Sequence, residues 1–213
     1  MESKKFDLIV IGAGPGGYVA ALSAARQGLK TAIVEKETVG GTCLGRGCIP
    51  TKTLLHPAEL YKGVKEGEEI GLLSEDLRVD MGRLKAYKDK VVNTLSQGIE
   101  SQFKKAKVSL FRGTAKITGL GEMKTVQVGE EVLEAEKILI ATGSLPFVPP
   151  IPGTNLPGVV DSTALLDNEK PLSSLVIIGG GVIGMEFASL YASLGTKVTV
   201  IEALDKILAT LDR

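Results

Sequence analysis

An internal repeat constrains the fold of this chain more than any other feature of its sequence. When the sequence is shifted by 167 residues, segment 7–36 aligns with segment 174–203 without a gap, and 10 of the 30 positions are identical. Two ordinary strand–helix units would share their hydrophobicity by chance, but they would rarely share their glycines and an acid at the same spacing. The shared residues include four pairs, namely Gly12/Gly179, Gly14/Gly181, Gly17/Gly184 and Glu35/Glu202.

Each copy predicts a strand, a tight turn, a helix and a second strand. In the first copy, the continuous apolar run 8–11 is typical of a strand that is covered on both faces. A glycine-rich turn follows, and the Ala-rich segment 18–27 predicts a helix that ends at Gly28. Residues 31–34 predict the second strand. The second copy predicts a strand over 176–178, a turn over 179–184, a helix to Leu194 that stops at Gly195, and a strand over 198–201.

Both turns match the pattern G-x-G-x-x-G, which is typical of dinucleotide-binding sites. The first glycine allows the tight turn, the second lets the backbone approach a pyrophosphate, and the third lets the helix pack closely on the strand. The helix N-terminus then offers unpaired N–H groups to the phosphates. Glu35 and Glu202 each lie 18 residues after the third glycine, where an acid accepts hydrogen bonds from a ribose, although either could be a solvated strand end. Because a carboxylate repels a 2′-phosphate, Glu202 favours NAD(H) over NADP(H).

The segment between the copies predicts a long helix followed by short strands. Asp80 is a candidate N-cap for a helix that runs towards Lys107, with an apolar face on Leu84, Val91, Leu95, Ile99 and Phe103. The strands are expected over 108–111, 115–118, 125–128, 132–135 and 137–140. Four prolines over 146–152 predict a stiff connector. We therefore expect an α/β fold with one domain over 1–147 and a second over 148–213.

Composition narrows the functional class. Lys plus Arg number 25 and Asp plus Glu number 25, without a basic stripe, so no nucleic-acid partner is expected. Neither a secretory signal nor an apolar run of about 20 residues is visible, so we expect no membrane partner and a cytoplasmic protein. Two cysteines are too few for a disulfide-stapled secreted scaffold.

Those two cysteines lie in the segment GGTCLGRGCIPTK, over residues 40–52. Cys43 and Cys48 can bridge only if the backbone between them turns sharply, and Gly45 and Gly47 supply that freedom. The segment follows Glu35 closely, so a disulfide there could exchange electrons with a flavin at the first site. Three other interpretations remain: buried structural thiols, an inert disulfide, or half of a zinc site, for which His56 is the only histidine; we expect no metal site.

GGTCLGRGCIPTK, with the flanking glycine motif, VEK and ATGS, resembles the pyridine nucleotide–disulfide oxidoreductases along the whole chain, and the dihydrolipoamide dehydrogenases most of all. Gly45 and Arg46 stand where that family commonly has Asn and Val. The resemblance implies a three-layer Rossmann-like FAD domain with a small β-meander, followed by an incomplete Rossmann-like NAD domain. It also implies that Cys43 exchanges with dihydrolipoamide and that Cys48 faces the flavin.

The same resemblance implies further site residues. Lys52 would lie near the flavin and pair with Glu186. NAD would contact Gly179, Gly181, Gly184 and Glu202. The FAD contacts would be Gly12, Gly14, Gly17, Glu35, Lys36, Gly41, Thr42, Lys52, Ala115, Thr142, Gly143 and Ser144.

The implied activity is dihydrolipoamide plus NAD⁺ giving lipoamide plus NADH. The implied partners are lipoyl groups on carrier proteins of 2-oxoacid dehydrogenase or glycine cleavage complexes, and a second copy in a homodimer. Alternatives are a mercuric or glutathione reductase, or an FAD-binding module without turnover. The chain ends 11 residues after Glu202. We expect the family's acid–base His–Glu pair to lie outside it, since His56 matches no such position, and we expect these 213 residues alone to be inactive.

Overall fold

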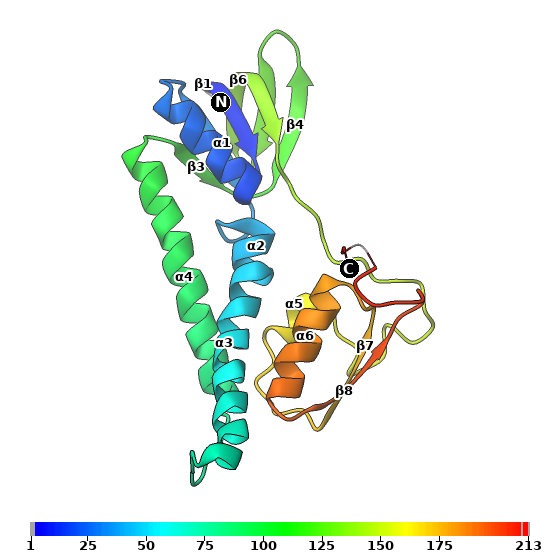
Figure 1. Cartoon of the computed structure of the whole chain (residues 1–213). Helices are drawn as coiled ribbons and strands as arrows, with labels where there is room; N and C mark the ends of the chain where they lie inside the picture. The colour runs from blue at the N-terminus through cyan, green and yellow to red at the C-terminus, as the bar shows by residue number, and fades with distance from the viewer. Residues whose placement is uncertain (1–2, 210, 213) are drawn as a thin grey trace. The chain divides into compact units, whose positions relative to one another are not determined.

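The computed structural model describes residues 3–209, 211 and 212, and the chain forms two compact units (Figure 1). One unit contains the residues up to Cys48 together with 92–145, and the other contains 49–91 and the residues from Pro146 onward. The chain thus passes between units at the start of the proline-rich connector, while segment 49–91 belongs to the second unit. The assignment of 1–147 and 148–213 as functional domains stays a prediction.

The first unit is built on one six-stranded sheet with the order β3-β2-β1-β6-β5-β4. Strands β1, β2, β3 and β6 run parallel, and β5 and β4 add an antiparallel edge. Every residue of β2 is buried, as its apolar run predicts. The α/β class is therefore confirmed. The strands are β1 (Lys4–Ile11), β2 (Thr31–Glu35), β3 (Ser109–Arg112), β4 (Ala115–Leu120), β5 (Lys124–Val128) and β6 (Glu131–Ile140).

The prediction of separate strands over 132–135 and 137–140 is wrong, because both belong to β6. Ala135 pairs with Phe6 of β1 in parallel and with Lys124 of β5 in antiparallel orientation. Glu136 interrupts the apolar pattern, but its side chain is exposed and the ladder to β1 continues beyond it. A charged residue on an open face does not end a strand.

Helices connect these strands and lead into the second copy of the repeat. Asp80 caps α4 as predicted, since its Oδ1 accepts a hydrogen bond from the N–H of Arg83 at 2.9 Å. The predicted apolar face of α4 is only partly correct: Ile99 and Phe103 are buried, but Leu95 is 42% exposed. The helices are α1 (Pro15–Arg26), α2 (Gly41–Arg46), α3 (Cys48–Glu66), η1 (Gly67–Ile70), α4 (Met81–Lys105) and α5 (Ser162–Leu165).

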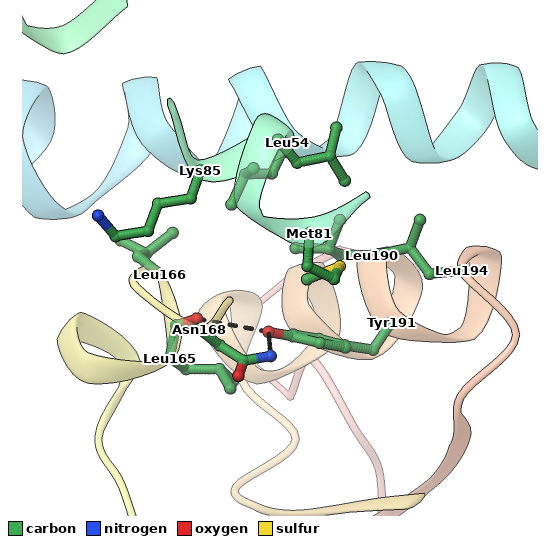
Figure 2. Close-up of a pocket in the computed structure, with 10 residues that line it drawn as sticks. Leu54, Met81, Lys85, Leu165, Leu166, Asn168, Leu190, Tyr191 and Leu194 are labelled. Carbon is green, nitrogen blue, oxygen red and sulfur yellow. Dashed lines mark hydrogen bonds between the residues drawn. The ribbon is translucent and has the colours of Figure 1, made fainter. Parts of the chain in front are cut away.

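The second unit contains the second copy of the repeat as β7 (Ser174–Ile178), α6 (Val182–Ser193) and β8 (Lys197–Ile201). The two strands pair in parallel, as in the first copy. A small pocket lies in the apolar core of this unit (Figure 2). There the hydroxyl of Tyr191 accepts a hydrogen bond from Asn168 at 3.3 Å, and burial raises the pKa of this hydroxyl. The lining is mostly aliphatic and includes Leu54, Met81, Leu84, Leu166, Leu190 and Leu194.

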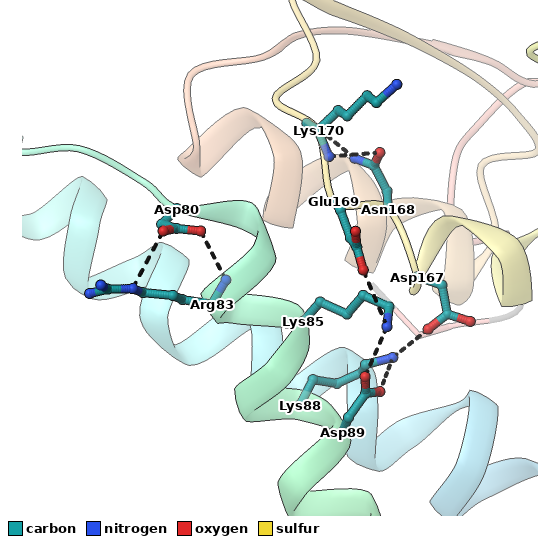
Figure 3. Close-up of polar contacts among 9 residues, drawn as sticks. All are labelled: Asp80, Arg83, Lys85, Lys88, Asp89, Asp167, Asn168, Glu169 and Lys170. Atoms are coloured by element: carbon teal, nitrogen blue, oxygen red, sulfur yellow. Dashed lines mark hydrogen bonds and ion pairs between the residues drawn. The ribbon is translucent and has the colours of Figure 1, made fainter.

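A buried lysine on α4 replaces part of the predicted apolar face. Lys88 is 4% exposed, and its Nζ lies 2.6 Å from Asp167 Oδ1 and 2.8 Å from Asp89 Oδ1 (Figure 3). Lys85 pairs with Asp89 as well, at 3.0 Å. Burial raises the pKa of the Asp89 carboxyl, but hydrogen bonds from Lys88 and Lys85 outweigh it and leave this pKa below its ordinary value. The ion pairs thus join α4 to the segment after α5.

Replacing Asp167 with alanine should lower the free energy of unfolding by about 1–2 kcal/mol, because the buried ammonium of Lys88 loses its shorter ion pair. Urea unfolding of the variant measures this loss. The control is Glu66→Ala, which removes the exposed pair between Lys62 and Glu66. That change should stay within about 0.5 kcal/mol of the parent. Equal losses in the two variants would contradict a special role for Lys88.

None of the helices in residues 3–209, 211 and 212 combines the length and apolar character that crossing a bilayer requires.

Candidate functional site

The first and third glycines of each turn have steric roles that a larger residue could take only with strain. Gly12 and Gly179 have φ of +100° and +110°, where L side chains are disfavoured. A Cβ on Gly17 would lie 1.8 Å from the carbonyl oxygen of Gly12, and a Cβ on Gly184 would lie 2.1 Å from that of Gly179. These glycines therefore create the tight turn and the close approach of helix to strand that the motif predicts.

The middle glycine of each turn leaves open space instead. Gly14 and Gly181 are the N-caps of α1 and α6, with extended backbone. A Cβ on Gly181 would meet nothing within 4 Å, and one on Gly14 would make only ordinary contact, at 3.7 Å from the Cα of Gly41. The chain itself does not require these two glycines. The missing side chains leave the helix N-termini accessible, which is what an approaching pyrophosphate needs.

The acid of each copy closes its glycine turn through two backbone hydrogen bonds. Glu35 accepts from the N–H of Ala13 at 2.7 Å and from that of Glu37 at 2.8 Å. Glu202 accepts from the N–H of Gly180 at 2.6 Å and from that of Leu204 at 2.9 Å. A carboxylate has about four acceptor sites, so each acid keeps capacity for ribose hydroxyls. The sequence did not indicate this second role of the acid, which is to stabilise the glycine turn through hydrogen bonds.

Replacing Glu35 with glutamine should lower the free energy of unfolding by about 1–3 kcal/mol, because the amide NH₂ then faces an N–H donor. A ribose-only role would leave the unliganded protein unchanged, since an amide can still bond hydroxyls. Denaturant unfolding without cofactor distinguishes the two. The exposed glutamate Glu130, changed to glutamine, is the control and should shift stability by less than about 0.5 kcal/mol.

The same substitution at Glu202 has a predictable pH dependence. Hydrogen bonds from the backbone N–H groups of Leu204 and Gly180 hold the pKa of this carboxyl below its ordinary value. A depressed pKa contributes stability above the unfolded-state pKa of about 4, and this contribution is lost as the pH falls through the folded-state pKa. The stability difference between the parent and Glu202→Gln, measured by denaturant unfolding across the pH range, should therefore be present at neutral pH and shrink in acid.

Several residues for which the resemblance implies contact with FAD lie beside the first turn, and the neighbouring Gly40 is bonded to it. The N–H of Gly40 donates to the carbonyl of Ala13 at 2.9 Å. A Cβ on Gly41 would lie 2.5 Å from the Cα of Gly14, so this backbone contact depends on glycine. A Cβ on Gly143 would lie 3.9 Å from Thr42 Oγ1, which places segment 142–144 beside the start of α2. The structure thus brings segments 12–17, 41–42 and 142–144 together.

Lys36 and Ala115 lie at the edge of this cluster. Lys36 is exposed, and its Nζ lies 3.6 Å from Glu37 Oε1. Ala115 is the first residue of β4, and the preceding turn is held near the acid because the N–H of Gly113 donates to the carbonyl of Glu35 at 2.9 Å. Contacts of Lys36 and Ala115 with FAD stay predictions.

The cysteine segment forms two helices separated by Gly47. Cys43 lies in α2 and is partly buried, whereas Cys48 is the first residue of α3 and is exposed. A Cβ on Gly47 would lie 2.9 Å from the carbonyl oxygen of Thr42, so the turn requires this glycine. The prediction for Gly45 is wrong, because it lies inside α2 and a Cβ there would meet nothing within 4 Å. A larger residue fits at that position.

Lys52 and Glu186 form the ion pair that the resemblance implies, with Nζ and Oε1 2.6 Å apart. Lys52 follows Cys48 by four residues on α3, which places both on the same helix face, one turn apart. Its role beside a flavin stays a prediction. His56 is exposed on the same helix. In the described part of the chain, no three His, Cys, Asp or Glu side chains form a group that could hold a metal ion.

Comparison with known proteins agrees with this geometry. A family model described as pyridine nucleotide-disulphide oxidoreductase matches residues 6–213. A dihydrolipoyl dehydrogenase of Acholeplasma laidlawii is 45% identical over 215 residues, which cover 99% of this chain and 63% of that protein. A dihydrolipoyl dehydrogenase of Bacillus subtilis is 41% identical, and the match covers 98% of this chain and 46% of that protein. The solved structure of the HOCl-induced flavoprotein disulfide reductase RclA from Escherichia coli superimposes with a TM-score of 0.82 at 35% identity. The match covers 97% of this chain and 44% of that one. The chain thus spans about half the length of most of these proteins.

Proposed function

The chain belongs to the pyridine nucleotide-disulphide oxidoreductases, and on that basis we propose that it carries the FAD site, the redox cysteines and the NAD-binding turn of a dihydrolipoyl dehydrogenase. FAD and NAD(H) are the cofactors of this family. The reaction is dihydrolipoamide plus NAD⁺ giving lipoamide plus NADH. One observation carries the proposal: Gly41 packs directly on Gly14 of the first turn, and Cys43 follows two residues later.

The cysteines act by thiol–disulfide exchange. A thiolate of the substrate attacks Cys43 Sγ, the Cys43–Cys48 bond breaks, and Cys48 leaves as a thiolate. The second substrate thiolate then attacks the mixed disulfide, which releases the cyclic disulfide and leaves Cys43 reduced. The two electrons of the substrate now reside on the cysteine pair, and its two protons have been released or transferred. FAD, when bound, supplies two-electron exchange between this pair and the nicotinamide.

The two turns divide the cofactors between them. The open position at Gly14 and the N-terminus of α1 would hold the FAD pyrophosphate, with Glu35 on the ribose. Gly181 and α6 would hold NAD, and the carboxylate of Glu202 disfavours the 2′-phosphate of NADP. Lys52, paired with Glu186, would place its ammonium near the flavin.

We further propose partners and location for the protein. Its substrates would be lipoyl groups on carrier proteins of 2-oxoacid dehydrogenase or glycine cleavage complexes, since several relatives are named dihydrolipoyl dehydrogenase. We also propose that the protein forms a homodimer. A cytoplasmic location is proposed because exchange-active thiols suit a reducing compartment.

Anaerobic reduction of the flavin tests the substrate class. Dihydrolipoamide should bleach the flavin absorbance of the FAD-loaded chain, whereas Cys43→Ser and Cys48→Ser should stay yellow. Reduced glutathione at equal thiol concentration is the control and should bleach it far more slowly. Bleaching by glutathione but not by dihydrolipoamide would contradict the lipoyl assignment. Failure to bind FAD would contradict the site itself.

A further inference from the structure

Arg46 lies between the two redox cysteines and is held by a carboxylate outside their segment. It is the last residue of α2, three residues after Cys43 and two before Cys48. Its Nη1 lies 2.9 Å from Glu37 Oε2, and its side chain is only 26% exposed. The guanidinium therefore packs against the protein rather than extending into solvent.

Glu37 is itself anchored through its backbone. Its N–H donates to Glu35 Oε1 at 2.8 Å, and its carbonyl accepts from Arg112 Nη1 at 2.7 Å. The other oxygen of Glu35 accepts from the N–H of Ala13 in the first glycine turn. A continuous series of polar contacts thus runs from that turn, through Glu35 and Glu37, to Arg46.

The internal repeat shows which part of this series belongs to the nucleotide turn. Leu204 occupies the place of Glu37 in the second copy, and its N–H donates to Glu202 in the same way, at 2.9 Å. Leu204 is 63% exposed, and its side chain carries no charge. The backbone bond is common to both copies, whereas the carboxylate of Glu37 occurs only in the copy that leads into the cysteines.

We propose that Arg46 is a positioning residue for the Cys43–Cys48 pair. Its ion pair with Glu37 links the last turn of α2 to the residues just after β2. This link limits the conformations of the segment that contains the two cysteines. A restricted segment raises the effective concentration of one thiol towards the other and favours their disulfide. This role rests on the proposed redox function of the pair.

The test is the equilibrium between the Cys43–Cys48 disulfide and glutathione, measured on the chain without FAD. Arg46→Leu should lower the equilibrium constant for formation of the Cys43–Cys48 disulfide by about 2- to 5-fold. Glu37→Leu, which places at position 37 the leucine found in the second copy, should lower it by the same factor. The double variant should lose no more than either single variant. Arg46→Lys should keep part of the effect, and 1 M salt, where the Debye length is about 3 Å, should move the parent towards the variants.

Matched measurements distinguish positioning by Arg46 from a direct effect of its charge. Lys4→Ala removes the half-exposed pair with Glu131 in the same unit and should leave the constant unchanged. Far-UV circular dichroism and denaturant unfolding verify that each variant folds. Opposite shifts in Arg46→Leu and Glu37→Leu would show that charge acts directly on the thiols and overturn the proposal, as would unchanged constants. A parent chain that forms no disulfide would instead remove the redox function on which the proposal depends.

Discussion

Replacing Gly17 with alanine is expected to lower the free energy of unfolding of the first unit by about 3 kcal/mol or more. The added Cβ would lie 1.8 Å from the carbonyl oxygen of Gly12 and 3.3 Å from the Cβ of Ala141. The nearest neighbour is backbone, so no flexible side chain can move aside. Helix α1 must therefore shift away from the end of β1. Denaturant unfolding of the cofactor-free chain measures the loss.

The adjacent glycine is a matched control for this prediction. Gly16 lies in the same turn of α1, and a Cβ there would meet nothing within 4 Å. Gly16→Ala should therefore keep or slightly raise stability, since alanine favours a helix over glycine by about 1 kcal/mol. Gly184→Ala should resemble Gly17→Ala in the second unit, because its Cβ would lie 2.1 Å from the carbonyl of Gly179. Equal behaviour of Gly16→Ala and Gly17→Ala would contradict the close packing of helix on strand.

Serine at the middle glycines should remove cofactor binding without loss of stability. Serine is a good N-cap residue, and the structure leaves room for its side chain at Gly14 and Gly181. The same side chain occupies the path of the pyrophosphate. Gly14→Ser should therefore weaken FAD binding at least about 100-fold, and Gly181→Ser should do so for NAD.

Each serine variant is the control for the other. Fluorescence titration with FAD and calorimetric titration with NAD⁺ should show that each variant loses one cofactor and keeps the other. Denaturant unfolding should place both within about 0.5 kcal/mol of the parent. FAD binding that survives Gly14→Ser would contradict the placement of the pyrophosphate at the first turn. Loss of both FAD and NAD⁺ binding in one variant would contradict the assignment of FAD to the first copy of the repeat and of NAD to the second.

The repeat made much of the fold predictable from the sequence. The glycine spacing places the turns, and apolar runs bounded by glycine place the strands β1, β2, β7 and β8 within a few residues. Local signals were weaker where a charge interrupts an apolar pattern. Glu136 suggested a strand end inside β6, although its side chain only faces outward. Lys88 carries a charge that is typical of a helix surface, but its ion pair with Asp167, 79 residues away, lets it be buried.

The site was predictable to the extent that it depends on local sequence. Spacing identified the glycines and acids, and the resemblance identified the pair Lys52 and Glu186, which the structure contains. The hydrogen bond from the N–H of Ala13 to Glu35 was missed because the fold brings together two residues that lie 22 positions apart in the chain. The contact between Arg46 and Glu37 was missed for a related reason, since it joins Arg46 of α2 to an acid nine residues earlier in the chain. Sequence spacing carries no signal for such contacts.

An anaerobic reductive titration of the FAD-loaded chain tests the central claim most directly. If Cys43 and Cys48 exchange electrons with the flavin, the parent should take up about two electron pairs per flavin, one for the disulfide and one for FAD. Cys48→Ser should take up about one. An uptake of one pair by the parent, equal to that of the variant, would contradict the account.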